Sequence, residues 1–166
     1  VHKILQTISE GEIEQWTSEK INHTLPHWKQ LLFQANIAAS EISSALELVK
    51  QSISNCLNDE KGRWILSSQQ RAKAEFALSK QQADGITHAV LDRCFLNQDG
   101  SYWVIDYKII KALKLDDASL EKLKKQYSAQ LKHYTELLSN LTDKPVKAAI
   151  YLPLQAHLLV MAEANS

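Results

Sequence analysis

The hydrophobic pattern of the chain changes once, from helical spacing to short apolar runs, and this change predicts an α/β fold. In the first part, apolar positions recur three and four residues apart, which is typical of helices that bury one face. Later runs are rich in β-branched and aromatic residues and are bounded by turn-forming residues, which indicates strands. The expected strands span residues 72–78, 86–96, 102–110, 146–152 and 158–161. We therefore expect one domain over 1–166, mainly helical over 1–70 and with a sheet core over 71–166.

Two helices are expected in the first part of the chain. Residues 1–22 are expected to form the first helix. The second is expected to begin at Thr24 and to continue to Asn58, because Pro26 is tolerated in the first turn of a helix. A break is expected near Asn36, a residue type that adopts the left-handed conformation found at helix ends.

The order of the strands predicts a central mixed sheet flanked by helices. The runs 86–96 and 102–110 are joined by a short turn-forming segment and should form an antiparallel hairpin. A polar loop is expected before the first of them, over 81–85. The return from 102–110 to 146–152 passes through a helix expected at 119–139, which is the usual connection between parallel neighbours.

The length of the hairpin loop decides whether Asp92 and Asp106 share a face of the sheet. A two-residue loop at Gln98 and Asp99 puts the two acids on opposite faces. A three-residue loop that also includes Gly100 puts them directly opposite one another on the same face. Glycine suits the left-handed last position of such a loop, so we expect the longer loop.

Charged side chains occur where the strand pattern predicts burial. Asp106 and Lys108 are two residues apart in one strand and therefore share a face, and Asp92 lies in the strand before. One interpretation is that these residues form the solvent face of an alternating strand. The alternative is a functional cluster, because charged residues are rarely buried unless they are paired or bind a metal. Two carboxylates hold a hard cation, and an ammonium group helps to organise the attack of water on a phosphate.

Composition narrows the class of protein without naming a function. The chain has 166 residues, of which 45% are hydrophobic and 23% charged, as in ordinary soluble domains, and no apolar run is long enough to suggest a membrane span. Its 19 basic and 19 acidic residues argue against a domain that holds DNA by electrostatics alone. They do not argue against a nuclease, whose acidic metal site offsets a basic surface. Two distant cysteines, Cys56 and Cys94, exclude a four-cysteine metal site and favour a reducing, cytoplasmic setting.

Several motifs taken together resemble one known family. They are Asp92-Arg93, the run Trp103-Val104-Ile105-Asp106-Tyr107-Lys108, and Tyr127, Gln130 and Tyr134. As a set they are similar to the nuclease domain of the RecB/AddA helicase-nucleases, which belong to the PD-(D/E)XK phosphodiesterase superfamily. The start of the chain around His2 resembles the histidine-bearing helix that opens that domain, and the resemblance extends to about Leu154. Ala89 and Ile109 depart from the glycine and threonine that the family usually has there.

The resemblance implies a metal centre with an adjacent lysine. Asp92, Asp106 and the carbonyl of Tyr107 would hold Mg²⁺ or Mn²⁺, which prefer oxygen ligands and retain waters. His2 would ligate the same ion through a ring nitrogen, whereas a lone histidine is otherwise most often structural. Lys108 would position the attacking water, help to deprotonate it, or stabilise the developing negative charge.

The resemblance also implies further residues around the metal. Glu75 would be an additional acid close to the site, although an isolated glutamate on a strand usually faces solvent. Gln130 would bind the site or the scissile phosphate, with Tyr127 and Tyr134 beside it; the alternative is an ordinary boundary glutamine on a helix.

The function that the resemblance implies is a metal-dependent DNA exonuclease within an ATP-dependent helicase-nuclease of double-strand break repair and recombination. The chain contains no Gly-rich phosphate loop, so ATP would be used only by a helicase part outside it. Its start without methionine leads us to expect a piece of a larger protein, with DNA and a second helicase-nuclease subunit as partners and no membrane. Two alternatives are a catalytically inactive nuclease-like DNA-binding or scaffold module and a stand-alone PD-(D/E)XK endonuclease.

Overall fold

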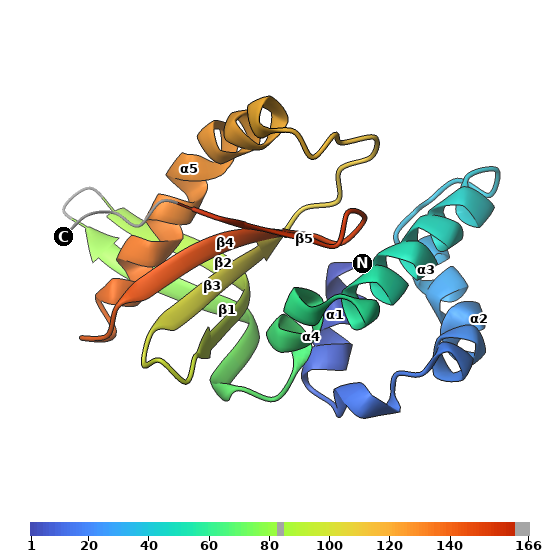
Figure 1. Ribbon diagram of the computed structural model, residues 1–166, viewed down its shortest axis with the longest axis horizontal. Coiled ribbons are helices and arrows are strands. Elements are labelled where there is room, and N and C mark those ends of the chain that lie inside the picture. The colour runs from blue at the N-terminus through green and yellow to red at the C-terminus, as the bar shows by residue number, and fades with distance from the viewer. Residues whose placement is uncertain (83–84, 162–166) are drawn as a thin grey trace.

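The structure is a computed structural model that describes residues 1–82 and 85–161. Its strands form one sheet in the order β1-β2-β3-β4-β5, with helices packed against the sheet (Figure 1). The strands are β1 (Gln70–Gln82), β2 (Gly85–Leu96), β3 (Tyr102–Tyr107), β4 (Val146–Leu152) and β5 (His157–Val160). The helices are α1 (His2–Ser9), the 3₁₀ helix η1 (Ile13–Gln15), α2 (Ser18–Gln34), α3 (Ile42–Asn58), α4 (Glu60–Leu66) and α5 (Asp117–Ser139). The prediction of an α/β protein with a central mixed sheet is confirmed.

The helices at the start of the chain differ from the sequence prediction. A single helix over 1–22 is wrong, because α1 ends at Ser9 and α2 begins only at Ser18. The Thr17 hydroxyl accepts a hydrogen bond from the Lys20 amide at 3.2 Å and caps the first turn of α2. A helix start at Thr24 is therefore wrong as well, and Pro26 lies inside α2 rather than in its first turn.

The break expected in the long helical run is confirmed. Asn36 has a φ of 59°, in the left-handed region that asparagine tolerates better than most residues. Its amide donates to the Phe33 carbonyl at 3.0 Å, directly after the end of α2. The chain then turns and begins α3 at Ile42.

β4 has the predicted ends, β2 and β5 differ from the prediction by one residue at one or both ends, and β1 and β3 differ by more. β1 is longer than the predicted 72–78, because its ladder with β2 continues to the pair Gln82 and Gly85. The expected polar loop over 81–85 is therefore mostly strand where the structure describes it, and residues 83–84 lie outside the described part. β3 is shorter than the predicted 102–110 and ends at Tyr107, the last residue that pairs with β4.

The register of the β2–β3 hairpin is the one expected for the three-residue loop. The Asn97 amide donates to the Ser101 carbonyl at 2.9 Å, and the Gly100 amide donates to the Asn97 carbonyl at 3.0 Å. Gly100 has a φ of 82°, the left-handed conformation predicted for it. The ladder ends with Arg93 opposite Ile105, so the next residues inward are Asp92 and Asp106. β3 and β4 are parallel, as expected from the intervening α5.

Two hydrophobic clusters stabilise the sheet from its two sides. The first lies between the sheet and α1 to α4 and includes Leu5, Ile53, Ile65 and Phe95, all fully buried. The second lies under α5 and includes Leu91, Val104, Leu131 and Ile150. Apolar burial of this kind contributes about 25 cal/mol per Å² removed from water. Each face of β3 is thus covered by helices, and this places the polar residues at its end within the protein rather than on its surface.

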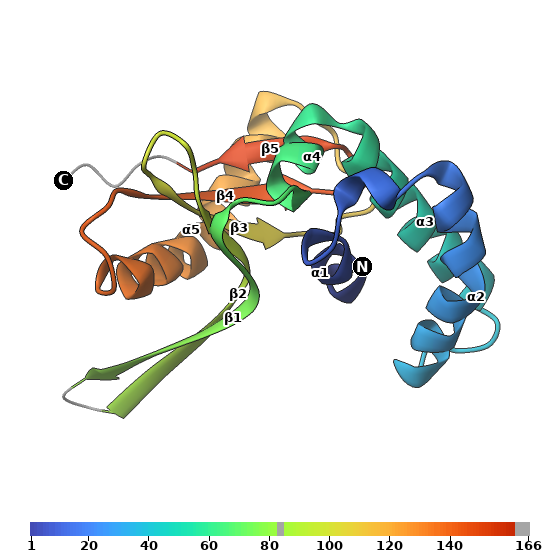
Figure 2. The same ribbon diagram turned by 90° about the horizontal axis from the view of Figure 1, so that it is seen from below.

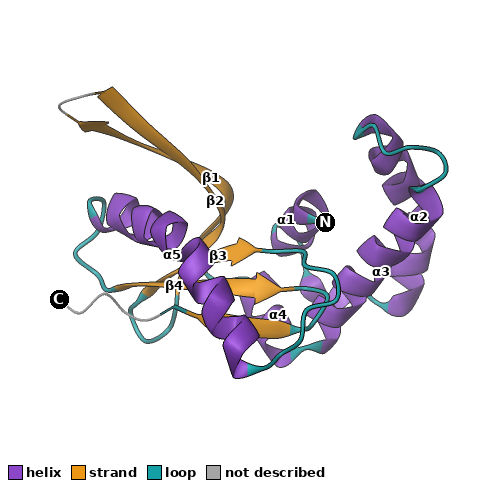
Figure 3. Ribbon diagram, turned by 90° about the horizontal axis from the view of Figure 1, so that it is seen from above, coloured by secondary structure: helices purple, strands orange, loops and turns teal. Residues whose placement is uncertain are grey.

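Two parts of the chain project from this body. Figures 2 and 3 show β1 and β2 continuing away from the other strands as a twisted hairpin, while α2 and α3 extend on the other side of α1. In the hairpin, Leu78 and Ala89 are buried, whereas Ile86 and Val90 are exposed. One face of the hairpin therefore belongs to the core and the other faces solvent.

Gly62 is expected to be the glycine that tolerates substitution least. A Cβ atom at Gly62 would lie 2.6 Å from the Tyr151 hydroxyl and closer still to the Cys56 carbonyl oxygen. Gly62→Ala should therefore lower the free energy of unfolding by about 3 kcal/mol, as overpacking of a closed core does. The measurement is urea unfolding followed by circular dichroism. Gly11→Ala is the matched control, because its nearest neighbour would be the Thr7 carbonyl oxygen at 3.6 Å; equal losses in both variants would contradict the prediction.

Candidate functional site

The hairpin brings Asp92 of β2 to the end of β3. The Tyr107 amide donates a hydrogen bond to Asp92 Oδ2 at 2.8 Å, across a sequence separation of 15 residues. Asp92 and Asp106 thus meet on neighbouring strands, as the three-residue loop predicts. The backbone hydrogen bond fixes one oxygen of Asp92.

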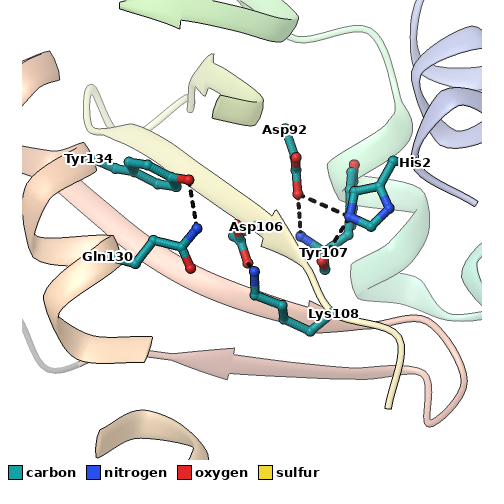
Figure 4. A network of polar contacts seen from close by, with 7 residues as sticks. All are labelled: His2, Asp92, Asp106, Tyr107, Lys108, Gln130 and Tyr134. Carbon is teal, nitrogen blue, oxygen red and sulfur yellow. Dashed lines mark hydrogen bonds and ion pairs between the residues drawn. The ribbon is translucent and has the colours of Figure 1, made fainter. Parts of the chain in front are cut away.

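Asp106 and Lys108 form the second part of the site (Figure 4). Lys108 Nζ lies 2.8 Å from Asp106 Oδ2, with the Asp106 side chain 4% exposed and the Lys108 side chain 22% exposed. The ammonium group is close to this oxygen, but the approach is not that of an aligned hydrogen bond, and Oδ2 has no other partner in the described part of the chain. The Lys108 amide donates to the Tyr151 carbonyl at 3.0 Å, which holds the residue in line with β4.

The pKa values of this pair shift for different reasons. Burial raises the pKa of Asp106; nearby Lys108 opposes this shift and Asp92 adds to it. Burial alone would lower the pKa of Lys108, but the close contact with the negatively charged Asp106 carboxylate outweighs it, so the pKa of Lys108 is raised. The two directions are compatible because Lys108 is more exposed and has less hydration to lose. Lys108 is thus a protonated ammonium group at neutral pH.

His2 reaches the site from the start of α1. Its Nε2 atom lies 2.9 Å from the Tyr107 carbonyl oxygen and 3.4 Å from Asp92 Oδ2. The interaction with Asp92 raises the pKa of His2 more than burial lowers it. The predicted approach of His2 to the site is confirmed for Asp92, although the two residues are far apart in sequence.

Helix α5 supplies three polar or aromatic residues above the Asp106–Lys108 pair. Lys108 Nζ lies 4.8 Å from the centre of the Tyr127 ring, a distance at which the ring face attracts a cation. Gln130 Nε2 donates to the Tyr134 hydroxyl at 2.7 Å. Figure 4 shows the Gln130 side chain pointing from α5 toward Lys108. α5 therefore brings to the site the three residues that the resemblance implies.

Glu75 is not brought into this cluster. Its side chain is exposed, and among residues 1–82 and 85–161 it forms no hydrogen bond or ion pair with Asp92, Asp106 or His2. Its φ of 47° lies in the left-handed region, so the backbone of β1 departs from strand geometry at this point. The simple alternation of side chains, on which the expected position of Glu75 depends, does not hold there.

Two residues that support the site were not predicted from the sequence. Gln155, in the turn between β4 and β5, donates from Nε2 to the Ile110 carbonyl at 2.8 Å and so holds the segment that follows Lys108. Tyr151 supplies the carbonyl that binds the Lys108 amide. Neither has a sequence signal, because a glutamine in a turn and a tyrosine in a buried strand are common.

The donors at the site are of the kind that Mg²⁺ or Mn²⁺ binds. They comprise two carboxylates, the Tyr107 carbonyl and the imidazole of His2, and Asp106 Oδ2 is buried with an unused acceptor capacity. In the part of the chain that the structure describes, no group of three or more His, Cys, Asp or Glu side chains is arranged to hold a metal ion. Mg²⁺ is commonly held by one or two carboxylates and several waters, so the two aspartates fit it without a complete protein cage.

The fold and the site define an α/β protein with a five-stranded mixed sheet and an Asp–Asp–Lys cluster at the end of β3. No protein-family model and no curated protein matches the chain. Of the helices within 1–82 and 85–161, none has both the length and the apolar character that crossing a membrane requires.

Proposed function

We propose that this protein is a metal-dependent phosphodiesterase of the PD-(D/E)XK superfamily that cleaves DNA. The observation that carries the proposal is the position of Lys108 Nζ, 2.8 Å from Asp106 Oδ2, at the end of the strand whose Tyr107 amide binds the Asp92 carboxylate. This arrangement puts a cation-binding pair and a fixed positive charge at one point, where a phosphate and its attacking water would need both. A surface ion pair would not require the burial that Asp106 has.

Each residue has a distinct part in the proposed reaction. Asp92 and Asp106 would hold the cation, with the Tyr107 carbonyl and His2 as further donors. When bound, Mg²⁺ supplies an acidified water and offsets the negative charge of the phosphate. Lys108, an ammonium group beside Asp106, would stabilise negative charge and orient the attacking water. Gln130 and Tyr134, which are joined by their own hydrogen bond on α5, would bind the DNA strand beside the cleaved bond.

The resemblance to RecB/AddA-type proteins supplies the proposed setting. There the domain is an exonuclease in an ATP-dependent helicase-nuclease of break repair and recombination, paired with a second helicase-nuclease subunit in the cytoplasm. ATP is used only by the helicase part.

A cleavage assay tests the proposal. Linear double-stranded and single-stranded DNA should be degraded in the presence of Mg²⁺ or Mn²⁺, and EDTA should stop the reaction. Isothermal titration calorimetry with Mn²⁺ on the same preparation measures cation binding separately. If the protein binds no divalent cation and leaves DNA intact, the phosphodiesterase is refuted and an inactive nuclease-like scaffold is the better description.

A further inference from the structure

A cavity of about 510 Å³ lies on the other side of β2 from Asp92. Arg93 follows Asp92 in the strand, so its side chain leaves the opposite face. The polar residues that line the cavity are Ser9, Glu10, Ser68, Gln69, Lys73, Glu75 and Arg93. The volume falls in the range of small-molecule sites, which is about 300 to 1,000 Å³.

Arg93 is a buried cation at this cavity and is only 2% exposed. Its Nε donates to the Ile65 carbonyl and its Nη2 to the Ser67 carbonyl, both at 3.1 Å. Its Nη1 has no hydrogen-bond partner among the residues that the structure describes, and no carboxylate there lies within ion-pair distance of the guanidinium. Two carbonyls thus hold the group in place, and Nη1 is left as a free donor that is not fully enclosed by the protein.

The other charges around the cavity are more exposed. Lys73 adds a second cation, with its Nζ 4.1 Å from the centre of the Phe76 ring. Glu10 and Glu75 bring opposite charge, but both are exposed to solvent, which screens them. Glu10 is in addition held by Gln6, whose Nε2 donates to Glu10 Oε1 at 2.9 Å. The Arg93 guanidinium is less exposed than these side chains, so solvent screens its charge less than theirs.

We propose that this cavity binds a phosphate group, with Arg93 Nη1 as its donor and Lys73 as a second cation. Guanidinium, ammonium and hydroxyl donors together are the usual partners of phosphate in proteins, and Ser68 supplies the hydroxyl. The phosphate belongs either to a free nucleotide or to a nucleic-acid strand, and the chemistry recognised is the same. This site does not depend on the proposed cleavage of DNA, because it lies on the other face of β2 from Asp92.

The test is a titration of the whole chain in EDTA, at constant ionic strength, with inorganic phosphate and with thymidine monophosphate. Amide shifts in two-dimensional NMR should show saturable binding, with the largest changes at Ser68, Gln69 and Arg93. Sodium chloride at the same ionic strength should produce no such changes. Lack of saturation, or shifts confined to Lys108 and its neighbours, would overturn the proposal.

Charge variants at the cavity have expected effects of opposite sign. Lys73→Gln should weaken phosphate binding about threefold, and Glu75→Gln should tighten it by a similar factor, as expected for partly screened charges. Arg93→Lys keeps the positive charge but loses the planar guanidinium and its fixed set of donors, so it should weaken binding tenfold or more. Lys122→Gln, exposed on α5, is the matched control and should change nothing. If Arg93→Lys fails to fold, the proposal is tested by the other two variants, in which phosphate binding should change in opposite directions. Equal phosphate affinity in Lys73→Gln and Glu75→Gln would refute the site.

The source of the phosphate is decided with a short single-stranded oligonucleotide. If the strand supplies it, the oligonucleotide should shift the same amides and inorganic phosphate should compete with it. If only the mononucleotide binds, the site takes a free nucleotide. Both outcomes are measured without divalent metal, so failure of the phosphate site and failure of the proposed nuclease are distinguishable.

Discussion

Asp106→Asn is expected to abolish divalent cation binding and to lower DNA cleavage about a thousandfold or more, because metal assistance is worth several kcal/mol in the transition state. The amide keeps the volume of the side chain but loses the charge that binds the ion. Mn²⁺ calorimetry and the cleavage assay measure the two effects. Asp143→Asn, an exposed acid in the loop before β4, is the control and should match the wild type in both.

The same substitution is expected to leave the fold intact. Burial raises the pKa of Asp106, so the folded state favours the protonated carboxyl. The stability that this preference contributes is present below the ordinary pKa of the carboxyl and is lost as pH rises through the raised value. At neutral pH the charged Asp106 therefore opposes folding, and Asp106→Asn should unfold at the same urea concentration as the wild type or a higher one. A variant that unfolds at clearly lower urea would show that the pair with Lys108 is a net stabiliser.

Lys108→Ala is expected to separate cation binding from catalysis. An ammonium group does not ligate a cation, so Mn²⁺ affinity should remain close to that of the wild type. Cleavage should fall about a hundredfold or more, corresponding to on the order of 3 kcal/mol for one preorganised charge. The control is Lys111→Ala, an exposed lysine three residues further along the same segment. Wild-type cleavage by Lys108→Ala would refute the proposed mechanism at its central residue.

Much of the Asp–Asp–Lys cluster could be predicted because its geometry is local. The three-residue loop with Gly100 sets the register of the hairpin, and the alternation of side chains along a strand then places Asp92 and Asp106 together. The same alternation places Lys108 beside Asp106. These relations involve neighbouring strands and a few residues of chain, so they need no knowledge of the remaining fold.

The ends of the first helices could not be placed by periodicity alone. α1 and α2 are separated by the short helix η1, yet apolar residues continue through this segment at helical spacing. The capping hydroxyl of Thr17 decides where α2 begins, and it outweighs the preference of Pro26 for a first turn. The left-handed backbone conformation at Glu75 could not be predicted either, because no glycine there indicates a positive φ.

From the sequence alone one could predict the α/β class, the β2–β3 hairpin with β4 as its parallel neighbour, and the meeting of two acids and a lysine, because each depends on local periodicity, on one tight turn or on the usual connection between parallel strands. Only the tertiary structure decided which distant groups join them. The packing of α1 brings His2 to the Tyr107 carbonyl, and the packing of α5 brings Tyr127 and Gln130 over Lys108. The same packing leaves Glu75 outside the cluster. It also buries Arg93 with no carboxylate of the described residues within ion-pair distance. Such contacts depend on how helices and strands pack against the sheet, and this packing cannot be predicted from the spacing of residues along the chain.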